Sequence, residues 1–248
     1  MPAGTRIGAG GQAANVAAWA VALGGGGRYL GKRADDAAGA LVAAELERHG
    51  VALRGPIVSG RTGVVVSLVD ADGERSMASD RGAAAELGPD EVDAAWLDGC
   101  DVLHVSGYAL ARTPVADAAE RLAGLARARD VAVSTDVSAA TLVDTAFRDR
   151  LGRLRPDVLF ATEAEREALG GELAAPAWVL KRGERGCRFS RDGESIELPP
   201  DPGPVVDTTG AGDALAAGFL LGGTLEQAAV RAMRAAARCV AGLGSMPE

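Results

Sequence analysis

Apolar residues recur along the chain with two different periodicities, and these predict the order of its helices and strands. Short apolar runs typical of buried strands occupy residues 101–108, 131–136, 157–161 and 178–183. Between the first two runs, residues 113–129 carry apolar side chains at helical spacing, as one face of an amphipathic helix does. Strands that alternate with helices favour a parallel sheet covered on both faces. The pattern therefore predicts an α/β fold.

The same reading predicts elements toward both ends of the chain. Residues 16–23 are apolar and rich in alanine, which is typical of a buried helix, and residues 35–50 have helical spacing up to a closing glycine. Residues 224–240 form a further predicted helix that begins with a Thr-x-x-Gln capping box. Residues 28–32 follow four glycines, whose backbone freedom is costly to restrict, so only a weak or short strand is expected there.

A β-hairpin is predicted in the first third of the chain. Extended runs at residues 64–69 and 74–78 flank an Asp-Ala-Asp-Gly turn at residues 70–73. The sequence contains no internal repeat and no low-complexity linker. We therefore expect one domain over residues 1–248, with a lid contributed by residues 61–80 or so.

Composition and charge narrow the functional class. The chain has 248 residues, of which 48% are hydrophobic and 4% aromatic, so alanine and valine must supply most of the core. The net charge of −8 and the lack of a basic stretch argue against nucleic acid as the main partner. No apolar run approaches the ~18 residues of a membrane span, and no signal peptide is recognisable. Three widely spaced cysteines without a CxxC pair indicate reduced thiols in a cytoplasmic protein.

The strongest candidate for chemistry is the stretch Asp-Thr-Thr-Gly-Ala-Gly-Asp at residues 207–213. It opens the apolar run 214–221, so a loop of small residues is expected to place free backbone N–H groups at a helix start. Such a terminus binds anions, phosphate above all. Asp213 could simply stabilise that helix start, or it could accept a proton from a hydroxyl that attacks a bound phosphate.

A second candidate lies near the N-terminus, at Gly10, Gly11, Gln12 and Asn15. A dinucleotide fingerprint is excluded here because almost no chain precedes these glycines to form the required strand. Asn15 is either a helix cap or a buried polar residue that needs a partner. Ser106 is a further candidate, because functional side chains gather at the carboxyl ends of parallel strands.

These two motifs resemble the signatures of the ribokinase-like (PfkB) sugar kinases, DTTGAGD the C-terminal signature and GGQAANVA the N-terminal one. The resemblance runs from Gly10 to the end of the chain. It implies a ribokinase-like three-layer α/β/α sandwich with a mainly parallel central sheet and a small β-hairpin lid. It also implies an anion hole formed by the amides of Gly210, Ala211 and Gly212, with Asp213 as the catalytic base. The glycine pair and Asn15 would hold sugar hydroxyls, with Gln12 and Ser106 beside them.

The resemblance assigns further residues to nucleotide and metals. ATP would lie near Thr162, Lys181, Gly183 and Thr208 as well as the anion hole. Glu165 would organise Mg²⁺ through water, although Thr162 stands where the family usually has Asn, and Thr-x-x-Glu is also a capping box. Lys181 could instead be an exposed residue at a strand end.

Other features that the resemblance suggests concern a second cation and the lid. Asp207 and Thr209 match in type the residues beside which family members often bind K⁺. Arg75 and Arg81 on the hairpin could touch a polar substrate or could be solvated charges. A homodimer joined through the lid is also compatible with the sequence, although no residue demands it.

Two departures from the family pattern stand out. The chain lacks the leading strand that usually carries a sugar-binding Asp, and residues 171–178 are short where a helix would be expected. We predict ATP-dependent phosphorylation of a hydroxymethyl group on a small sugar or sugar acid of the ribose, fructose or 2-keto-3-deoxygluconate type. The alternatives are a nucleoside kinase of the same fold and a truncated, non-catalytic nucleotide-binding remnant.

Overall fold

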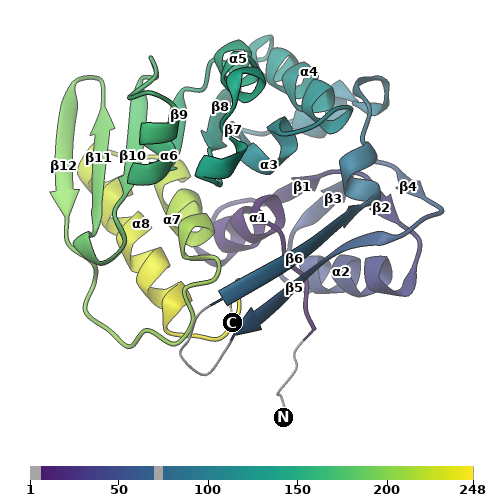
Figure 1. Cartoon of the computed structure of the whole chain (residues 1–248), viewed down its shortest axis with the longest axis horizontal. Helices are drawn as coiled ribbons and strands as arrows, with labels where there is room; N and C mark the ends of the chain where they lie inside the picture. Colours follow the sequence, from purple (N-terminus) through teal and green to yellow (C-terminus); the bar gives the residue numbers. More distant parts are fainter. Residues whose placement is uncertain (1–6, 70–74, 248) are drawn as a thin grey trace.

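A six-stranded sheet forms the centre of the molecule (Figure 1). The structure is a computed structural model that describes residues 7–69 and 75–247. The strand order is β12–β11–β10–β9–β8–β7; the strands from β7 to β10 run parallel, and β11 and β12 are antiparallel additions. Their bounds are Val102–Ser106 (β7), Ala132–Asp136 (β8), Val158–Thr162 (β9), Ala177–Lys181 (β10), Cys187–Arg191 (β11) and Glu194–Leu198 (β12). The predicted parallel sheet is confirmed.

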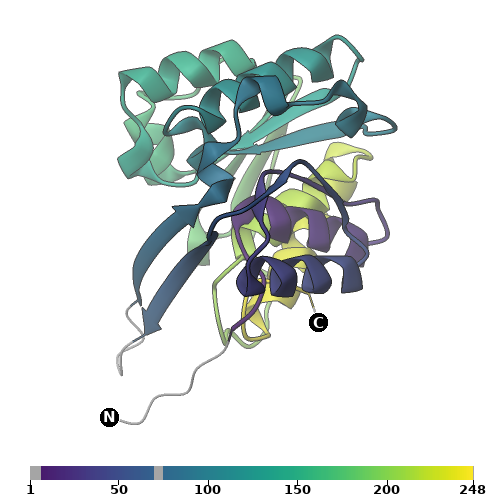
Figure 2. The ribbon, with the colours of Figure 1, turned by 90° about the vertical axis from the view of Figure 1, so that its right-hand side faces the viewer.

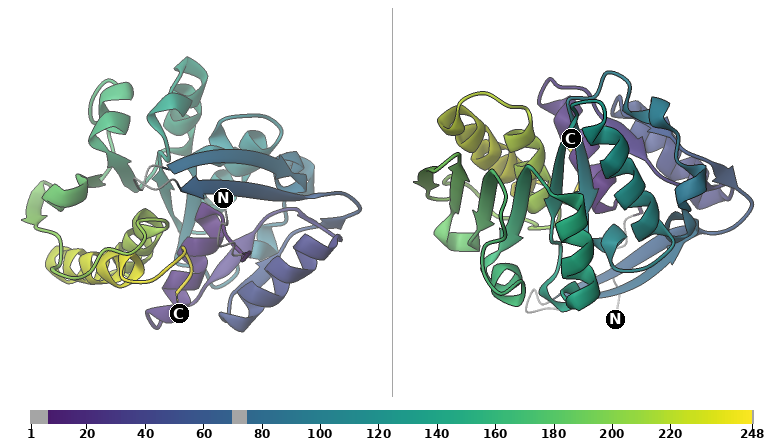
Figure 3. Two further views of the ribbon diagram at one scale, coloured as in Figure 1. Left: turned by 60° about the horizontal axis from the view of Figure 1, so that its bottom comes forward. Right: turned by 90° about the horizontal axis from the view of Figure 1, so that it is seen from above.

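Helices cover both faces of this sheet (Figures 1 and 3). One face packs against α4 (Val115–Arg127) and α5 (Thr145–Leu154), and the other against α1 (Gln12–Ala22), α7 (Ala211–Leu220) and α8 (Leu225–Val240). Alternate residues of β9 point to the two sides: Leu159 lies in the core under α4 and α5, whereas the Phe160 ring contacts the α7 side. The result is the three-layer α/β/α sandwich that the sequence predicted.

Small residues build the core, as the composition suggested. Ala214, Ala216 and Ala217 of α7 are almost fully buried. Gly218 faces α8 so closely that an added Cβ would lie 2.8 Å from the Cα of Ala232. This close approach packs α7 tightly against α8.

The N-terminal region forms a separate group of short elements. α2 (Ala37–Arg48) accompanies two parallel strand pairs, β1 with β3 and β2 with β4. Their bounds are Arg28–Leu30 (β1), Arg33–Ala34 (β2), Ala52–Arg54 (β3) and Ile57–Val58 (β4). In the described part of the chain, the six-stranded sheet therefore ends at β7. The missing leading strand concerns residues 1–6, which lie outside the described residues, so it stays a prediction.

The predicted hairpin is present as β5 (Thr62–Val69) and β6 (Arg75–Gly82). The two strands extend away from the body of the molecule (Figure 2). The predicted turn at residues 70–73 lies outside the described residues. The base of the hairpin is fixed by Asp36, whose carboxylate accepts hydrogen bonds from the Thr62 amide (2.9 Å) and hydroxyl (2.5 Å). Among its described residues, five large apolar side chains are exposed: Val64, Val65, Val66, Leu68 and Met77.

The strand predicted over residues 101–108 ends earlier than expected. Gly107 and Tyr108 begin the short helix α3 (Gly107–Leu110) instead. A Cβ at Gly107 would lie 2.2 Å from the Val137 carbonyl oxygen, so this tight turn depends on glycine. The remaining elements are α6 (Glu163–Ala168) and 3-10 turns at Ala83–Glu86, Pro89–Glu91, Ala94–Leu97, Ala140–Leu142 and Gly183–Arg185. Across residues 7–69 and 75–247, no helix is both long and apolar enough to cross a membrane.

Candidate active site

Four neighbouring parallel strands each end on a polar residue, and these ends meet at one edge of the sheet. Ser106, Asp136, Thr162 and Lys181 are the last residues of β7, β8, β9 and β10. Ser106 pairs in register with Asp136, and Lys181 with Thr162. Side chains in register point to the same side of a sheet, so all four face the layer that contains α1 and α7. This is the edge where parallel sheets bind ligands.

The start of α7 faces this edge. Gly210 precedes the helix in a left-handed conformation, with φ of 81°, and has no side chain to cap the amides of the first turn. A Cβ at Gly210 would lie 2.7 Å from the Cβ of Ser245, so the loop passes directly against the C-terminal segment. The Ala211 amide donates to the Thr208 carbonyl at 3.3 Å. This bond is long, and the first-turn amides together with the helix dipole give the site the positive potential that an anion requires.

Asp213 lies in the first turn of α7, and its residue is only 9% exposed. The side-chain amide of Asn15 donates to its Oδ2 at 2.6 Å. Burial raises the pKa of Asp213 from 3.8 to about 7, against the opposing effect of the Asn15 hydrogen bond; Asp136 raises it further, and Lys181 and Gln12 lower it. A carboxyl group that titrates near neutrality is suited to accept a proton.

Asn15 is held in place from both sides. Its Nδ2 bonds Asp213, and its Oδ1 accepts a hydrogen bond from the Ser245 hydroxyl at 3.1 Å. The interpretation of Asn15 as a helix cap is wrong, because Gly11 occupies the cap position of α1 with φ of 101° and Asn15 lies inside the helix. The buried-polar interpretation is therefore the correct one, and Asp213 is its partner.

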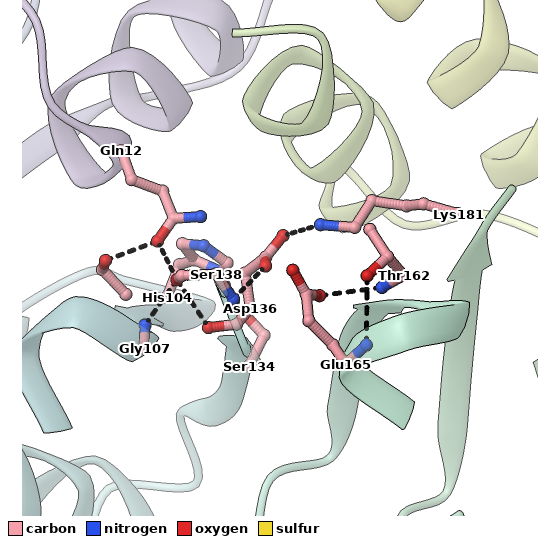
Figure 4. A network of polar contacts seen from close by, with 10 residues as sticks. Gln12, His104, Gly107, Ser134, Asp136, Ser138, Thr162, Glu165 and Lys181 are labelled. Carbon is pink, nitrogen blue, oxygen red and sulfur yellow. Dashed lines mark hydrogen bonds and ion pairs between the residues drawn. The ribbon is translucent and has the colours of Figure 1, made fainter. Parts of the chain in front are cut away.

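Gln12, the first residue of α1, joins two strand ends. Its Oε1 accepts hydrogen bonds from the hydroxyls of Ser106 and Ser138, the latter at 2.6 Å (Figure 4). Gly10 and Gly11 lie exposed in the loop just before it, with Gly10 close to Ser245. The structure thus brings the predicted N-terminal residues to the same edge as Asp213.

Lys181 and Asp136 form an ion pair in the middle of the site, with Nζ 2.6 Å from Oδ2 (Figure 4). The Lys181 side chain is 16% exposed, so it is not the exposed strand-end residue that the sequence left open. Its Nζ lies 3.6 Å from the position that a Cβ on Gly212 would occupy, beside the start of α7. Asp136 is 1% exposed and was missed by the sequence reasoning.

Thr162 and Glu165 form both hydrogen bonds of a capping box at the start of α6. The Thr162 amide donates to Glu165 Oε2 at 2.8 Å, and the other carboxylate oxygen points toward the Asp136 side of the site (Figure 4). Burial raises the pKa of Glu165, whereas the nearby Lys181 charge lowers it. A carboxylate with one oxygen directed into the site fits the oxygen ligands and bound waters that Mg²⁺ prefers. The capping role and a metal role are compatible.

The other predicted residues lie around this centre. Asp207 Oδ1 accepts from the Thr209 amide (2.9 Å) and hydroxyl (2.6 Å), and Oδ2 accepts from the Gly244 amide at 3.1 Å, so Asp207 ties the loop to the C-terminal segment. Gly183 lies two residues beyond Lys181, and its carbonyl accepts from Gly186 within its own turn. On the hairpin, Arg81 donates to the Tyr108 carbonyl at 2.8 Å.

Three residues of the site escaped the sequence reasoning: Asp136, Ser138 and Ser245. Asp136 carried a usable signal, because it is the last polar residue of a predicted strand, as Ser106 is. Ser138 sits in a loop with φ of 76°, and Ser245 comes close to Asn15 only through the folded chain. No local pattern marks either residue.

The sheet, with helices on both faces, places an uncapped helix start beside a buried carboxylate, an arrangement suited to holding an anion next to a proton acceptor. The chain belongs to the pfkB family of carbohydrate kinases, whose family model matches residues 2–246. It is a sugar kinase with the ribokinase fold.

Individual relatives support this assignment. The chain is 32% identical, over 93% of its length and 78% of the relative's, to an ATP-dependent ribose-1-phosphate kinase of Halopiger xanaduensis. Among solved structures, adenosine kinase from Sinorhizobium meliloti superposes with a TM-score of 0.88 at 29% identity, covering 96% of this chain and 79% of that one. A putative ribokinase II from E. coli, solved with ATP and Mg²⁺, shares the fold with a TM-score of 0.85 at 22% identity, covering 95% and 83% of the two chains.

Proposed function

We propose that this protein transfers the γ-phosphoryl group of ATP to a hydroxymethyl group of a small sugar or sugar acid, with Asp213 as the general base. The observation that carries the proposal is the position of Asp213. Its carboxylate is buried, is oriented by Asn15, and lies in the first turn of a helix whose dipole favours a bound anion. A base poised near neutrality can gain or lose a proton at physiological pH, and such help is typically worth ~10²–10⁴-fold.

The chemistry follows from these positions. Asp213 takes the proton of the sugar hydroxyl. The hydroxyl oxygen then forms a bond to the γ-phosphorus, and the bond between that phosphorus and the bridging oxygen of ADP breaks. The amides of Gly210, Ala211 and Gly212, at the start of α7, stabilise the charge on the transferred group. The chain would bind ATP near Thr162, Lys181, Gly183 and Thr208. Mg²⁺, organised through water by Glu165, would neutralise phosphate charge.

Neutral polar groups line the sugar end of this arrangement. Gln12, Ser106 and Asn15, with the Gly10–Gly11 loop, offer amide and hydroxyl groups that match the hydroxyls of a sugar. The similarity to a ribose-1-phosphate kinase adds phosphorylated ribose to the substrates worth testing. A panel of ribose, fructose, 2-keto-3-deoxygluconate and ribose-1-phosphate in an ADP-release assay would name the acceptor.

The test of the base is Asp213→Asn. We expect this variant to lose turnover on the best acceptor of the panel while it keeps its affinity for ATP, measured by calorimetry. Asp117→Asn is the matched control, because Asp117 pairs with Arg150 on the outer helices α4 and α5. Full activity of Asp213→Asn would remove Asp213 from its role as base.

A nucleoside kinase is the second candidate, and the similarity to an adenosine kinase favours it. Adenosine in the same panel separates the two functions. A non-catalytic remnant would bind nucleotide in calorimetry without any acceptor-dependent release of ADP.

Three further features belong to the proposal. K⁺ would bind beside Asp207 and Thr209, which a comparison of rates in potassium and sodium buffers tests. The exposed apolar side chains of β5 and β6 support a homodimer joined through the lid. Free thiols at all three cysteines support a cytoplasmic location.

A further inference from the structure

The ion pair between Lys181 and Asp136 is more deeply buried than stability alone would favour. Their side chains are 16% and 2% exposed. Removing two charges from water is costly, and buried ion pairs are often no better for stability than apolar residues of the same size. Burial of this pair is therefore weak evidence that it serves stability, and its position in the candidate site directs attention to a functional role.

The Lys181 ammonium is directed at the phosphate-binding end of the site. It lies against the Gly210–Gly212 turn, 3.6 Å from the place of a Cβ on Gly212. Burial alone would lower the pKa of Lys181, but attraction from Asp136, Glu165 and Asp213 outweighs it, so the pKa is raised and the amine stays charged. A permanent positive charge therefore lies beside the turn that would receive the phosphoryl group.

Hydrogen bonds through Asp136 connect the Lys181 ammonium to Gln12, which lies at the proposed sugar-binding end of the site. Its Oδ2 holds Lys181, and its Oδ1 accepts a hydrogen bond from the Ser138 amide at 2.8 Å. The Ser138 hydroxyl in turn donates to Gln12 at 2.6 Å. Figure 4 shows this chain of contacts crossing the site from Lys181 through Asp136 to Gln12. One carboxylate thus fixes the geometry of both halves.

We propose that Lys181 contacts the phosphoryl group during transfer, and that Asp136 is a positioning residue that holds the Lys181 ammonium against the start of α7. This inference rests on the proposed kinase function and adds Asp136 to it. Asp136 acts through Lys181: without the carboxylate, the long flexible side chain loses its fixed geometry although its charge remains. Because catalysis by positioned charge depends on geometry, misplacement is costly even when every phosphate ligand is present.

The experiment is a double-mutant cycle with Lys181→Met, Asp136→Asn and the double variant, measured as kcat on the best acceptor. We expect Lys181→Met to lower kcat by ~10²-fold, the loss typical of removing one donor to developing charge. We expect Asp136→Asn to lower kcat by ~10- to 10²-fold through misplacement. The double variant should be no slower than Lys181→Met, because Asp136 has nothing left to position.

A second readout does not depend on turnover. Calorimetry with ADP and with the non-hydrolysable analogue AMP-PNP, both with Mg²⁺, measures the contribution of the γ-phosphate to affinity. Lys181→Met should weaken AMP-PNP binding by about 10-fold, the value of one hydrogen bond between charged groups, and leave ADP binding near wild type. Asp136→Asn should shift the same ratio in the same direction.

Several results would overturn the proposal. Lys181→Met with wild-type kcat, or with an unchanged ratio of AMP-PNP to ADP affinity, removes the contact with the phosphoryl group. Multiplied losses in the double variant show that Asp136 acts on its own. Asp136→Asn could fail to fold because it leaves a buried ammonium unpaired. In that case the kcat of the double variant, which removes both charges, is compared with the kcat of Lys181→Met, and a slower double variant overturns the positioning role of Asp136.

The control for unspecific loss is the ion pair Arg150–Asp117, which joins two outer helices at 2.8 Å. Asp117→Asn should leave kcat unchanged. Asp213→Asn is measured in parallel. An active Asp213→Asn refutes the proposed base whatever the cycle shows, whereas an inactive Asp213→Asn with multiplied losses in the cycle refutes only the role of Asp136.

Discussion

Replacing Asp213 with Asn should stabilise the nucleotide-free protein in mildly alkaline solution. Burial raises the pKa of Asp213 from 3.8 to about 7 in the folded protein. The folded chain therefore holds this proton more tightly than the unfolded chain does. The resulting contribution to stability is fully present in acid, below the unfolded pKa, and is lost as the pH rises from that value through the folded pKa.

The size of the effect follows from these two pKa values. Each pKa unit corresponds to 1.36 kcal/mol, so linkage predicts that wild type loses about 3 kcal/mol relative to Asp213→Asn between pH 4.5 and pH 8. For a chain of 248 residues, this corresponds to a relative change of about 6–12 °C in melting temperature. The Asn side chain keeps an oxygen that can accept the bond from Asn15, so little else changes.

The measurement is urea or thermal unfolding of both proteins at pH 4.5, 6 and 8, without nucleotide or metal. Asp36→Asn is an informative control, because its effect on stability should depend on pH in the opposite direction. Hydrogen bonds from Thr62 lower the pKa of Asp36, so its substitution should be most harmful at high pH and should matter less in acid. A constant difference between Asp213→Asn and wild type at all three pH values would refute the raised pKa and the reasoning built on it.

Three other predictions concern neighbouring groups. The value of kcat/KM should fall below a pH of about 7 as one proton binds to Asp213. Asn15→Ala should move this acid limb to higher pH, because Asp213 loses a hydrogen-bond donor that lowers its pKa; a limb that stays in place would contradict the assignment. Gly210→Ala should destabilise the protein by more than ~1 kcal/mol in urea unfolding, since the new Cβ meets Ser245 and φ is positive. Thr162→Ala should lower the free energy of unfolding by about 1 kcal/mol, because α6 loses its cap, and should raise the Mg²⁺ concentration needed for half-maximal rate. An unchanged Mg²⁺ requirement would show that the residue acts only as a cap.

The parts of the fold that local patterns specify were predictable from the sequence. The amphipathic helix α4, the parallel strands and the capping box at Thr224 each depend on residues close together in the chain, and the structure contains all of them. The end of β7 was misplaced because Gly107 packs closely against the Val137 carbonyl and donates a hydrogen bond to the Ser138 hydroxyl, both of which lie just after β8. Those contacts leave no trace in local periodicity.

The site divides in the same way. An anion site at residues 207–213 could be proposed in advance, because a loop of small residues at a helix start has a local physical reason to bind phosphate. Gln12 and Asn15 were proposed from the resemblance to the PfkB family. Asp136 could have been found from its place at a strand end. Ser138 and Ser245 could not, since their roles depend on contacts with Gln12 and Asn15 across more than a hundred residues of sequence. The raised pKa of Asp213 likewise comes from burial by the whole fold.

Four adjacent strands end on polar residues of the candidate site, and this limits how the protein can change over evolutionary time. These residues are Ser106, Asp136, Thr162 and Lys181. Because side chains alternate along a strand, gaining or losing a single amino acid inside any of the four would swing its terminal group to the far side of the sheet. Length variation should therefore be confined to the connecting segments, whereas the strands themselves should tolerate only replacement.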